Sequence, residues 1–240
     1  AVEPETAHAI VATSGCTTAK VKVAATNQVA RDDVERLEAV RDALGPSGAV
    51  RVDANGAWGV DEAVERIREL DRAAGGLEYV EQPCASIDEL AAVRKRVDVR
   101  IAADESIRRA DDPLRVAVAE AADVAVLKAT PLGGVRRSLQ VAEACGLPCV
   151  VSSAVESSVG LAAQLALAGS LPQLPFACGL ATAALLDGDV VPGSTLPREG
   201  HLPVPNRPPE PAPALVAAAT PSAATQQRWL NRIQRVEALR

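Results

Sequence analysis

The sequence predicts an α/β protein whose strands and helices form a modified TIM-type (β/α) barrel. Short apolar runs rich in β-branched residues alternate with stretches of Ala, Leu, Glu and Arg, which is typical of repeated strand–helix units. In successive units, the apolar run ends at a polar side chain. These side chains are Lys22, Asp53, Glu81, Asp104, Lys128 and Ser152. Reactive groups at the carboxyl ends of successive strands favour a barrel. An open doubly wound sheet would need a glycine-rich turn after its first strand, and none occurs there.

The elements follow from this alternation, with glycine or proline at most junctions. The expected strands are 18–24, 50–54, 78–81, 100–104, 123–128, 149–153 and 176–179. The expected helices between them are 32–44, 60–73, 87–96, 113–119, 135–144 and 158–168. A further helix should begin at Pro4, because proline suits the first helical turn, and end at Gly15.

Composition excludes several classes of protein. The 240 residues are 48% hydrophobic and 23% charged, which suits a globular enzyme with a sizeable core. A net charge of −6 and only four aromatic residues argue against a nucleic-acid partner. The five scattered cysteines are expected to be reduced thiols, and Cys145 and Cys149 lie across a turn with no histidine nearby, so zinc is disfavoured. No segment suits a membrane, and a cytoplasmic location is expected.

The C-terminal part differs from the rest. We expect a catalytic barrel domain at 1–191 and a proline-rich segment with a terminal helix at 192–240. The stretch 192–221 should be extended and poor in helix because of its many prolines. The helix expected at 226–233 carries one apolar face made of Trp229, Leu230 and Ile233.

The placement of lysine indicates an acid–base site. Arginine outnumbers lysine 21 to 4, yet Lys20, Lys22 and Lys128 all end strand-like runs. Lysine can lose its proton and arginine cannot. Lys20 and Lys22 share one face of a strand, so their repulsion should lower the pKa of at least one of them. The alternative is a solvated Lys-x-Lys pair without a catalytic role. The apolar neighbours of the two lysines argue against it.

Three carboxylates suggest a magnesium site. Asp53, Glu81 and Asp104 each follow an apolar run, and three converging carboxylates need a cation. Oxygen ligands of this kind suit Mg²⁺, with Mn²⁺ as a substitute. Any one of them alone could be a helix cap or a loop acid. We expect Asn55 and Glu105 to support the ligands from behind, with Glu105 pointing away from Asp104.

Lys128 should enter the barrel mouth opposite Lys22. Two lysines flanking a cation-bound carboxylate substrate could remove the proton on the neighbouring carbon: one lysine takes the proton and the other steadies the intermediate. The sequence therefore predicts an enzyme acting on a small-molecule carboxylate.

Several motifs resemble those of one enzyme family. They are TAKVK at 18–22, RVDANG at 51–56, EYVEQP at 78–83, ADES at 103–106, LK at 127–128 and PLGG at 131–134. Together they resemble the muconate-lactonizing branch of the enolase superfamily. Within that branch, IAADESIR at 101–108, SSA at 152–154, ESS at 156–158 and ACGL at 177–180 are most similar to o-succinylbenzoate synthases of the menaquinone pathway, in their actinobacterial form.

The resemblance implies a role for each site residue. Lys22 would be the catalytic acid and base, Lys128 the opposing lysine that stabilises an enediolate, and Lys20 a substrate-orienting neighbour. Asp53, Glu81 and Asp104 would bind Mg²⁺. The implied reaction is a syn dehydration of 2-succinyl-6-hydroxy-2,4-cyclohexadiene-1-carboxylate to o-succinylbenzoate. The substrate-binding residues would include Ser152, Ser153, Cys178 and Gly179, although tight packing explains small residues at strand ends equally well.

The chain departs from that family at its start. Members begin with an α+β capping domain and a first barrel strand, whereas this sequence opens close to the first barrel helix. We therefore expect a barrel that is incomplete at its N-terminus and leaves an unpaired strand edge. Two alternatives stay open: a racemase or epimerase of N-acylamino acids or dipeptides with the same lysine pair, and a non-catalytic barrel fragment.

Overall fold

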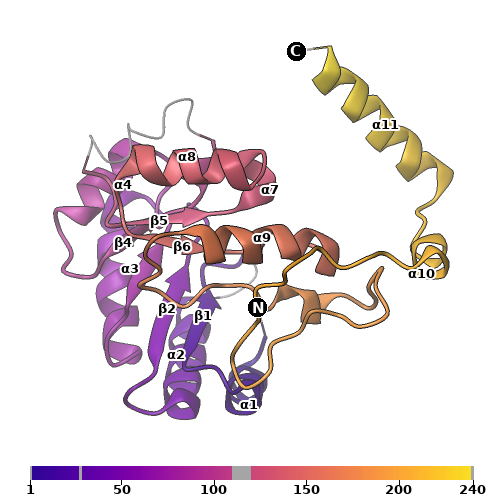
Figure 1. Ribbon diagram of the computed structural model, residues 1–240. Coiled ribbons are helices and arrows are strands. Elements are labelled where there is room, and N and C mark those ends of the chain that lie inside the picture. Colours follow the sequence, from indigo (N-terminus) through magenta and orange to yellow (C-terminus); the bar gives the residue numbers. More distant parts are fainter. Residues whose placement is uncertain (1, 27–28, 110–119, 239–240) are drawn as a thin grey trace.

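The computed structural model describes residues 2–26, 29–109 and 120–238 and contains one parallel, curled sheet. Its six strands are β1 (Thr18–Lys22), β2 (Ala49–Asp53), β3 (Tyr79–Glu81), β4 (Ile101–Ala103), β5 (Val124–Leu127) and β6 (Cys149–Val151). They lie side by side in chain order. A doubly wound sheet would reverse its order at one point. The strand order therefore confirms an incomplete (β/α) barrel (Figure 1).

Helices connect successive strands, as the alternation predicts. The helices that precede or follow the expected strands are α1 (Pro4–Ser14), α2 (Ala30–Leu44), α3 (Val60–Ala73), α4 (Ile87–Arg94), α8 (Val135–Cys145) and α9 (Ser158–Ser170). Two one-turn helices at strand ends, α5 (Glu105–Arg108) and α7 (Ala129–Leu132), and the 3₁₀ turn η1 (Thr182–Leu185) were not expected. The helix expected at 113–119 lies outside the described residues.

The helices form where apolar spacing and capping agree. In α3, Val64, Ile67 and Leu70 recur at helical spacing and are fully or almost fully buried against the sheet. Helix α4 begins with a capping box, in which the Ser86 hydroxyl accepts from the backbone N–H of Glu89 and the Glu89 carboxylate accepts from that of Ser86. Local signals therefore fix both the start of α4 and the buried face of α3.

The interior of the barrel is filled by a small cluster of buried residues that is separate from the larger hydrophobic core. Tyr79, Ala102, Val124, Val126 and Val150 form this cluster, and Phe176 packs against it. The guanidinium of Arg51 lies 4.6 Å from the centre of the Tyr79 ring and donates to the carbonyl of Ala177 at 2.7 Å. Inward-facing residues alternate along each strand with residues facing the helices. The interior is therefore packed, and the reactive side chains sit above it at the strand ends.

The seventh expected strand, 176–179, is wrong as a continuous element. Only Gly179 pairs there, in a parallel bridge with Ser152. The segment has β6 on one flank and, among the described residues, no strand on the other. Strand β1 likewise has its outer edge unpaired by any described strand, as expected for an incomplete barrel.

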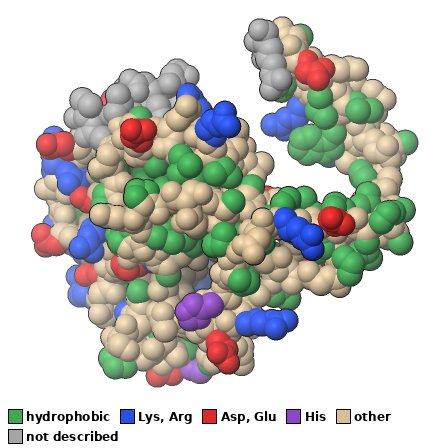
Figure 2. Space-filling view, viewed as in Figure 1, with side chains coloured by type: hydrophobic (Ala, Val, Ile, Leu, Met, Phe, Trp, Pro, Cys, Tyr) green, Lys and Arg blue, Asp and Glu red, His purple; other side chains and the backbone are tan. Residues whose placement is uncertain are grey.

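The C-terminal segment is only partly extended. The expectation for 192–221 fails at α10 (Pro213–Ala218), where a proline at the first turn precedes an alanine-rich run. Helix α11 (Ala223–Glu237) extends the expected 226–233, and its Trp229, Leu230 and Ile233 are about half exposed. Figure 1 shows α11 projecting away from the barrel, and Figure 2 shows hydrophobic side chains on that arm. Within the described residues, no helix has the length and apolar character needed to span a membrane.

Candidate active site

The first half of the site is an ion-pair cluster at the ends of β1, β2 and β3. The strand register places Lys22 beside Asp53 and Asp53 beside Glu81. Lys20 Nζ lies 3.2 Å from Asp53 Oδ2 and 2.9 and 2.8 Å from the two Glu81 oxygens. Lys22 Nζ donates to Asp53 Oδ2 and, at 2.8 Å, to Asn55 Oδ1. Both carboxylates are 1% exposed or less, so the cluster concentrates negative charge in a dry environment.

Burial and the neighbouring charges set the pKa values of this cluster. Burial raises the pKa of Glu81 to about 7, which the nearby Lys20 ammonium opposes and Asp53 reinforces. Burial opposes the charge of Lys20, but the Glu81 and Asp53 carboxylates outweigh it and raise the pKa of Lys20. Burial disfavours ionised Asp53 as well, but the two lysines prevail and lower its pKa. We expected repulsion to lower the pKa of at least one of the two lysines, but the pKa of Lys20 is raised because its ammonium faces two carboxylates.

The second half of the site is formed at the ends of β4 and β5. Lys128 Nζ lies 2.5 Å from Asp104 Oδ2, and Nε of Arg108 lies 3.3 Å from Asp104 Oδ1. Asp104 is 1% exposed, and the Lys128 side chain is 13% exposed. Lys22 is more accessible, with 52% of its side chain exposed. The two lysines therefore approach the carboxylates from opposite ends of a row of five strands.

A polar bridge joins the two halves. Asn55 Nδ2 lies 3.4 Å from Glu105 Oε1, and Arg108 Nη2 lies 2.7 Å from the same oxygen. Glu105 contacts neither Asp53 nor Asp104 through a described hydrogen bond, but it faces Asn55, the partner of Lys22. Its other oxygen, Oε2, is buried without a hydrogen-bond partner. Arg108 was not identified from the sequence, although its place four residues after Asp104 on a helix could have indicated the contact.

The small residues predicted to bind substrate lie together at the end of β6. Ser153 N and Oγ both donate to the carbonyl of Gly179, at 2.9 and 3.1 Å. A β-carbon on Gly179 would come within 3.2 Å of Ser152 Oγ. Cys178 is half-buried, and burial raises the pKa of its thiol. The close packing of these residues is established by these contacts, and substrate binding by them is a proposal.

The three carboxylates fit a hard divalent cation by their chemistry. Asp53, Glu81 and Asp104 are buried acidic side chains at the ends of three adjacent strands, and ammonium or guanidinium groups hold each of them. As the side chains stand, no three His, Cys, Asp or Glu residues within 2–26, 29–109 and 120–238 converge closely enough to hold a metal ion. Lys20, which bridges Asp53 and Glu81, supplies the positive charge between them. Oxygen donors of this kind are those that Mg²⁺ prefers.

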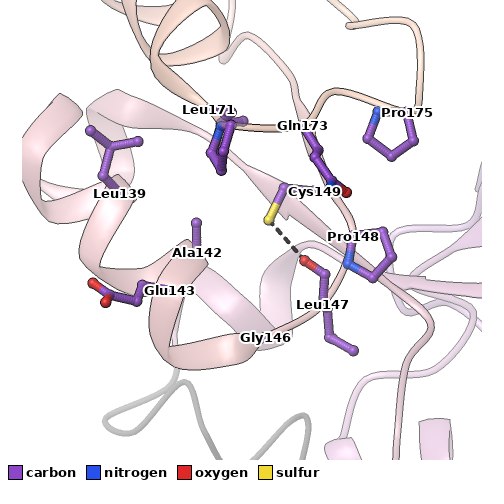
Figure 3. Close-up of a pocket in the computed structure, with 11 residues that line it drawn as sticks. Leu139, Ala142, Glu143, Gly146, Leu147, Pro148, Cys149, Leu171, Gln173 and Pro175 are labelled. Atoms are coloured by element: carbon purple, nitrogen blue, oxygen red, sulfur yellow. Dashed lines mark hydrogen bonds between the residues drawn. The ribbon is translucent and has the colours of Figure 1, made fainter.

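A separate apolar pocket lies at the other end of the barrel. It has a volume of about 620 Å³ and lies between the end of α8 and the loop after α9 (Figure 3). Cys149 begins strand β6 in its wall, and its thiol donates to the carbonyl of Leu147 at 3.2 Å. Because the lysines and carboxylates lie at the carboxyl ends of the strands, this pocket is no part of the candidate active site.

The fold and the site at the strand ends are those of a barrel enzyme, and the comparison with protein families gives the same class. The sequence model of the enolase C-terminal domain-like family matches residues 4–208. The chain therefore belongs to the enolase C-terminal domain-like family. This finding confirms the resemblance drawn from the motifs.

Curated relatives of this chain carry the name of one particular enzyme. A protein named o-succinylbenzoate synthase from Thermobifida fusca is 69% identical over 204 residues, which are 85% of this chain and 64% of that protein. One of the same name from Mycolicibacterium smegmatis is 52% identical over 225 residues, covering 94% of this chain and 68% of that protein. The chain thus spans about two thirds of the length of these relatives.

A solved structure gives the same fold with another named activity. The dipeptide epimerase from Enterococcus faecalis, complexed with Mg and the dipeptide L-Leu-L-Tyr, is 28% identical with a TM-score of 0.71. The match covers 83% of this chain and 57% of that one. The epimerase therefore shares the barrel, and it was solved with both a metal and a small ligand bound.

Proposed function

We propose that this chain carries the catalytic barrel of an o-succinylbenzoate synthase. The single observation behind the proposal is the row of buried carboxylates with Lys22 at one end and Lys128 at the other. The name shared by relatives at 69% and 52% identity supports the choice of reaction. The substrate would be 2-succinyl-6-hydroxy-2,4-cyclohexadiene-1-carboxylate.

Asp53, Glu81 and Asp104 would hold Mg²⁺, and Asn55 and Glu105 would support them. When bound, Mg²⁺ would offset the negative charge on the substrate carboxylate while the adjacent carbon loses its proton. Lys20 now contacts Asp53 and Glu81, and its ammonium would turn toward the substrate when those carboxylates hold the metal instead. The succinyl and carboxylate end of the substrate would be lined by Ser152, Ser153, Cys178 and Gly179.

Lys22 would perform both proton transfers. Its neutral amine takes the proton from the carbon next to the carboxylate, and the electron pair of that C–H bond moves into the enediolate. The charge of Lys128 stabilises this intermediate from the opposite side. Lys22 then gives the proton to the departing hydroxyl, the C–O bond breaks, and water leaves as the ring becomes aromatic. Transfer to the same face explains how one lysine serves as base and then as acid.

Residues 1–191 would make up the catalytic part, and 192–240 a C-terminal extension.

The test measures conversion of the cyclohexadiene substrate to o-succinylbenzoate with and without Mg²⁺. It compares the chain itself with a chimera completed by the remaining third of the Thermobifida fusca protein. Magnesium-dependent turnover that Lys22→Ala abolishes would support the dehydratase. No turnover by the chimera would contradict it and would favour a non-catalytic barrel.

A second activity has one observation in its favour. A dipeptide epimerase that was solved with Mg and a dipeptide shares this fold, which supports an epimerase as the alternative. Two lysines on opposite sides of a substrate could remove and return a proton on different faces. Exchange of the α-hydrogen of a dipeptide or N-acylamino acid for deuterium, lost in both Lys22→Ala and Lys128→Ala, would favour this racemase or epimerase function.

A further inference from the structure

We propose that Gln82 is a positioning residue that sets the separation between the carboxylates of Glu81 and Asp104. The residue directly follows Glu81 at the end of β3 and is fully buried. The inference rests on the metal site of the proposed function, because it assigns to Gln82 the task of keeping two of its ligands in register. Gln82 has no contact with the reacting groups in the structure, so its role is exerted through its neighbours.

The side chain of Gln82 makes four hydrogen bonds to the end of β4 and to its own loop. Oε1 accepts from the backbone N–H of Asp104 at 3.0 Å and from that of Ser106 at 3.2 Å. Nε2 donates to the Ser106 hydroxyl at 2.8 Å and to the Cys84 carbonyl at 2.9 Å. One rigid amide thus holds the backbone of a proposed ligand, Asp104, while its own backbone carries another, Glu81.

The main chain of Gln82 extends the connection to a third strand end. Its N–H donates to Ala102 O at 2.8 Å, and its carbonyl accepts from Gly56 N at 2.7 Å in the loop that follows Asp53. Its φ of 42° lies in the left-handed region, which side-chain-bearing residues adopt rarely. Such a conformation persists where surrounding contacts hold it, and it is concentrated at functional sites.

A neutral amide is the group that this place requires. It must accept two N–H groups and donate to two oxygens, which a carboxylate cannot do in its ionised form. It also adds no charge beside Glu81 and Asp104, which already repel each other. Asparagine has the same amide but is shorter by one methylene, so it could not reach Asp104 N and Ser106 N from the same backbone position.

A buried glutamine could also serve stability alone, and the chain offers a matched control for that reading. Gln164 is equally buried, accepts from Ala129 N at 2.8 Å and donates to Glu156 Oε1 at 2.7 Å. It lies on α9 and contacts none of the three carboxylates in the described hydrogen bonds. Loss of either amide should lower stability, whereas only loss of Gln82 should disturb the ligands.

The experiment measures Mn²⁺ binding by titration calorimetry and thermal stability for the 240-residue chain, Gln82→Met and Gln164→Met. Methionine retains the length of the side chain without its hydrogen bonds. We expect Gln82→Met to bind Mn²⁺ about 10- to 100-fold more weakly than the unmodified chain, the usual effect of losing an outer-shell partner. Gln164→Met should bind Mn²⁺ as the unmodified chain does, and its melting temperature should fall less than that of Gln82→Met because it loses two hydrogen bonds rather than four.

Equal Mn²⁺ affinity in Gln82→Met and the unmodified chain would overturn the inference, as would equal weakening in both variants. Absence of Mn²⁺ binding by the unmodified chain would instead overturn the proposed metal site, so the two failures are distinguishable. If Gln82→Met does not fold, Ser106→Ala decides, since it removes only the hydroxyl that accepts from Gln82 Nε2. It should weaken Mn²⁺ binding by a smaller factor, and unchanged binding would contradict the proposal.

Discussion

The ammonium nitrogen of Lys20 on β1 lies 2.8 Å from Oε2 of Glu81 on β3. These two strands are separated by β2 and do not pair with each other, so this contact between side chains spans the strand between them. The same nitrogen also reaches Asp53 on the strand between. Lys20 therefore compensates two buried carboxylates at once and performs, in the protein alone, the electrostatic task that a divalent cation would perform.

Removing this lysine should destabilise the metal-free protein. Lys20→Met would remove the ammonium that contacts Glu81 and leave Asp53 with Lys22 alone, and breaking a buried ion pair in this way typically costs about 3–5 kcal/mol. The Lys20 side chain is 24% exposed, so we expect the lower end, about 3 kcal/mol. Urea unfolding in EDTA measures the loss. The exposed Lys95→Met should show no comparable change, and a similar effect of the two variants would contradict the prediction.

The raised pKa of Glu81 predicts a pH-dependent stability. Its value of about 7 in the folded protein exceeds the ordinary 4.5, so the folded chain binds the proton more tightly than the unfolded chain. The contribution of Glu81 is fully present below pH 4.5 and is lost as the pH rises through 7. It should amount to about 3 kcal/mol. Unfolding in EDTA between pH 5 and pH 8 should show this fall, and Glu81→Gln should reduce it. Parallel profiles would contradict the assignment.

Arginine in place of either lysine separates proton transfer from charge. Lys22→Arg and Lys128→Arg keep a cation beside Asp53 and Asp104, but arginine does not release its proton at neutral pH. Turnover of the substrate should fall about 10²–10⁴-fold in Lys22→Arg, the range typical of a lost general base. A cation at Lys128 suffices for stabilisation of an enediolate, so Lys128→Arg should retain more activity in a dehydratase. Equal losses would favour the epimerase.

The sequence allowed the strand ends to be predicted because apolar runs stop where the barrel mouth begins. Asp53 and Glu81 each end a strand as expected, and the residues after β4 and β5 are Asp104 and Lys128. These positions depend on local patterning, which a single sequence displays directly. Helix 60–73 was predicted to the residue for the same reason, since its apolar stripe and flanking glycine are local signals.

Features that depend on contacts between distant segments could not be predicted. The strand expected at 176–179 is reduced to one bridge, between Gly179 and Ser152, because its apolar composition carries no information about which backbone groups find a partner. The buried amide of Gln82 looked like an ordinary residue of a motif, because its partners Asp104 and Ser106 lie one strand further on. The raised pKa of Lys20 was not predicted, since the sequence spacing revealed its lysine neighbour but not its contacts with the carboxylates.

The C-terminal segment should consist of a first part that stabilises the barrel and a second part, helix α11, that does not. Residues just after 191 contact the barrel: Thr195 N donates to the Ser158 hydroxyl at 2.7 Å, Leu202 packs against the core, and Gly200 lies against the backbone of Gly15. By contrast, the described residues of α11 are almost all exposed. A chain ending at Ser222 should therefore melt at the same temperature as the full chain.

A chain ending at Val191 should be less stable by about 2 kcal/mol, because it loses a partly buried leucine and a hydrogen bond to the start of α9. For a protein of this size, that loss corresponds to a melting temperature lower by about 4–8 °C. Calorimetry of the two truncated chains and the full chain measures both effects. A drop on removing α11 alone would show that its apolar face packs on the barrel in solution, contrary to the exposure of Trp229 and Ile233.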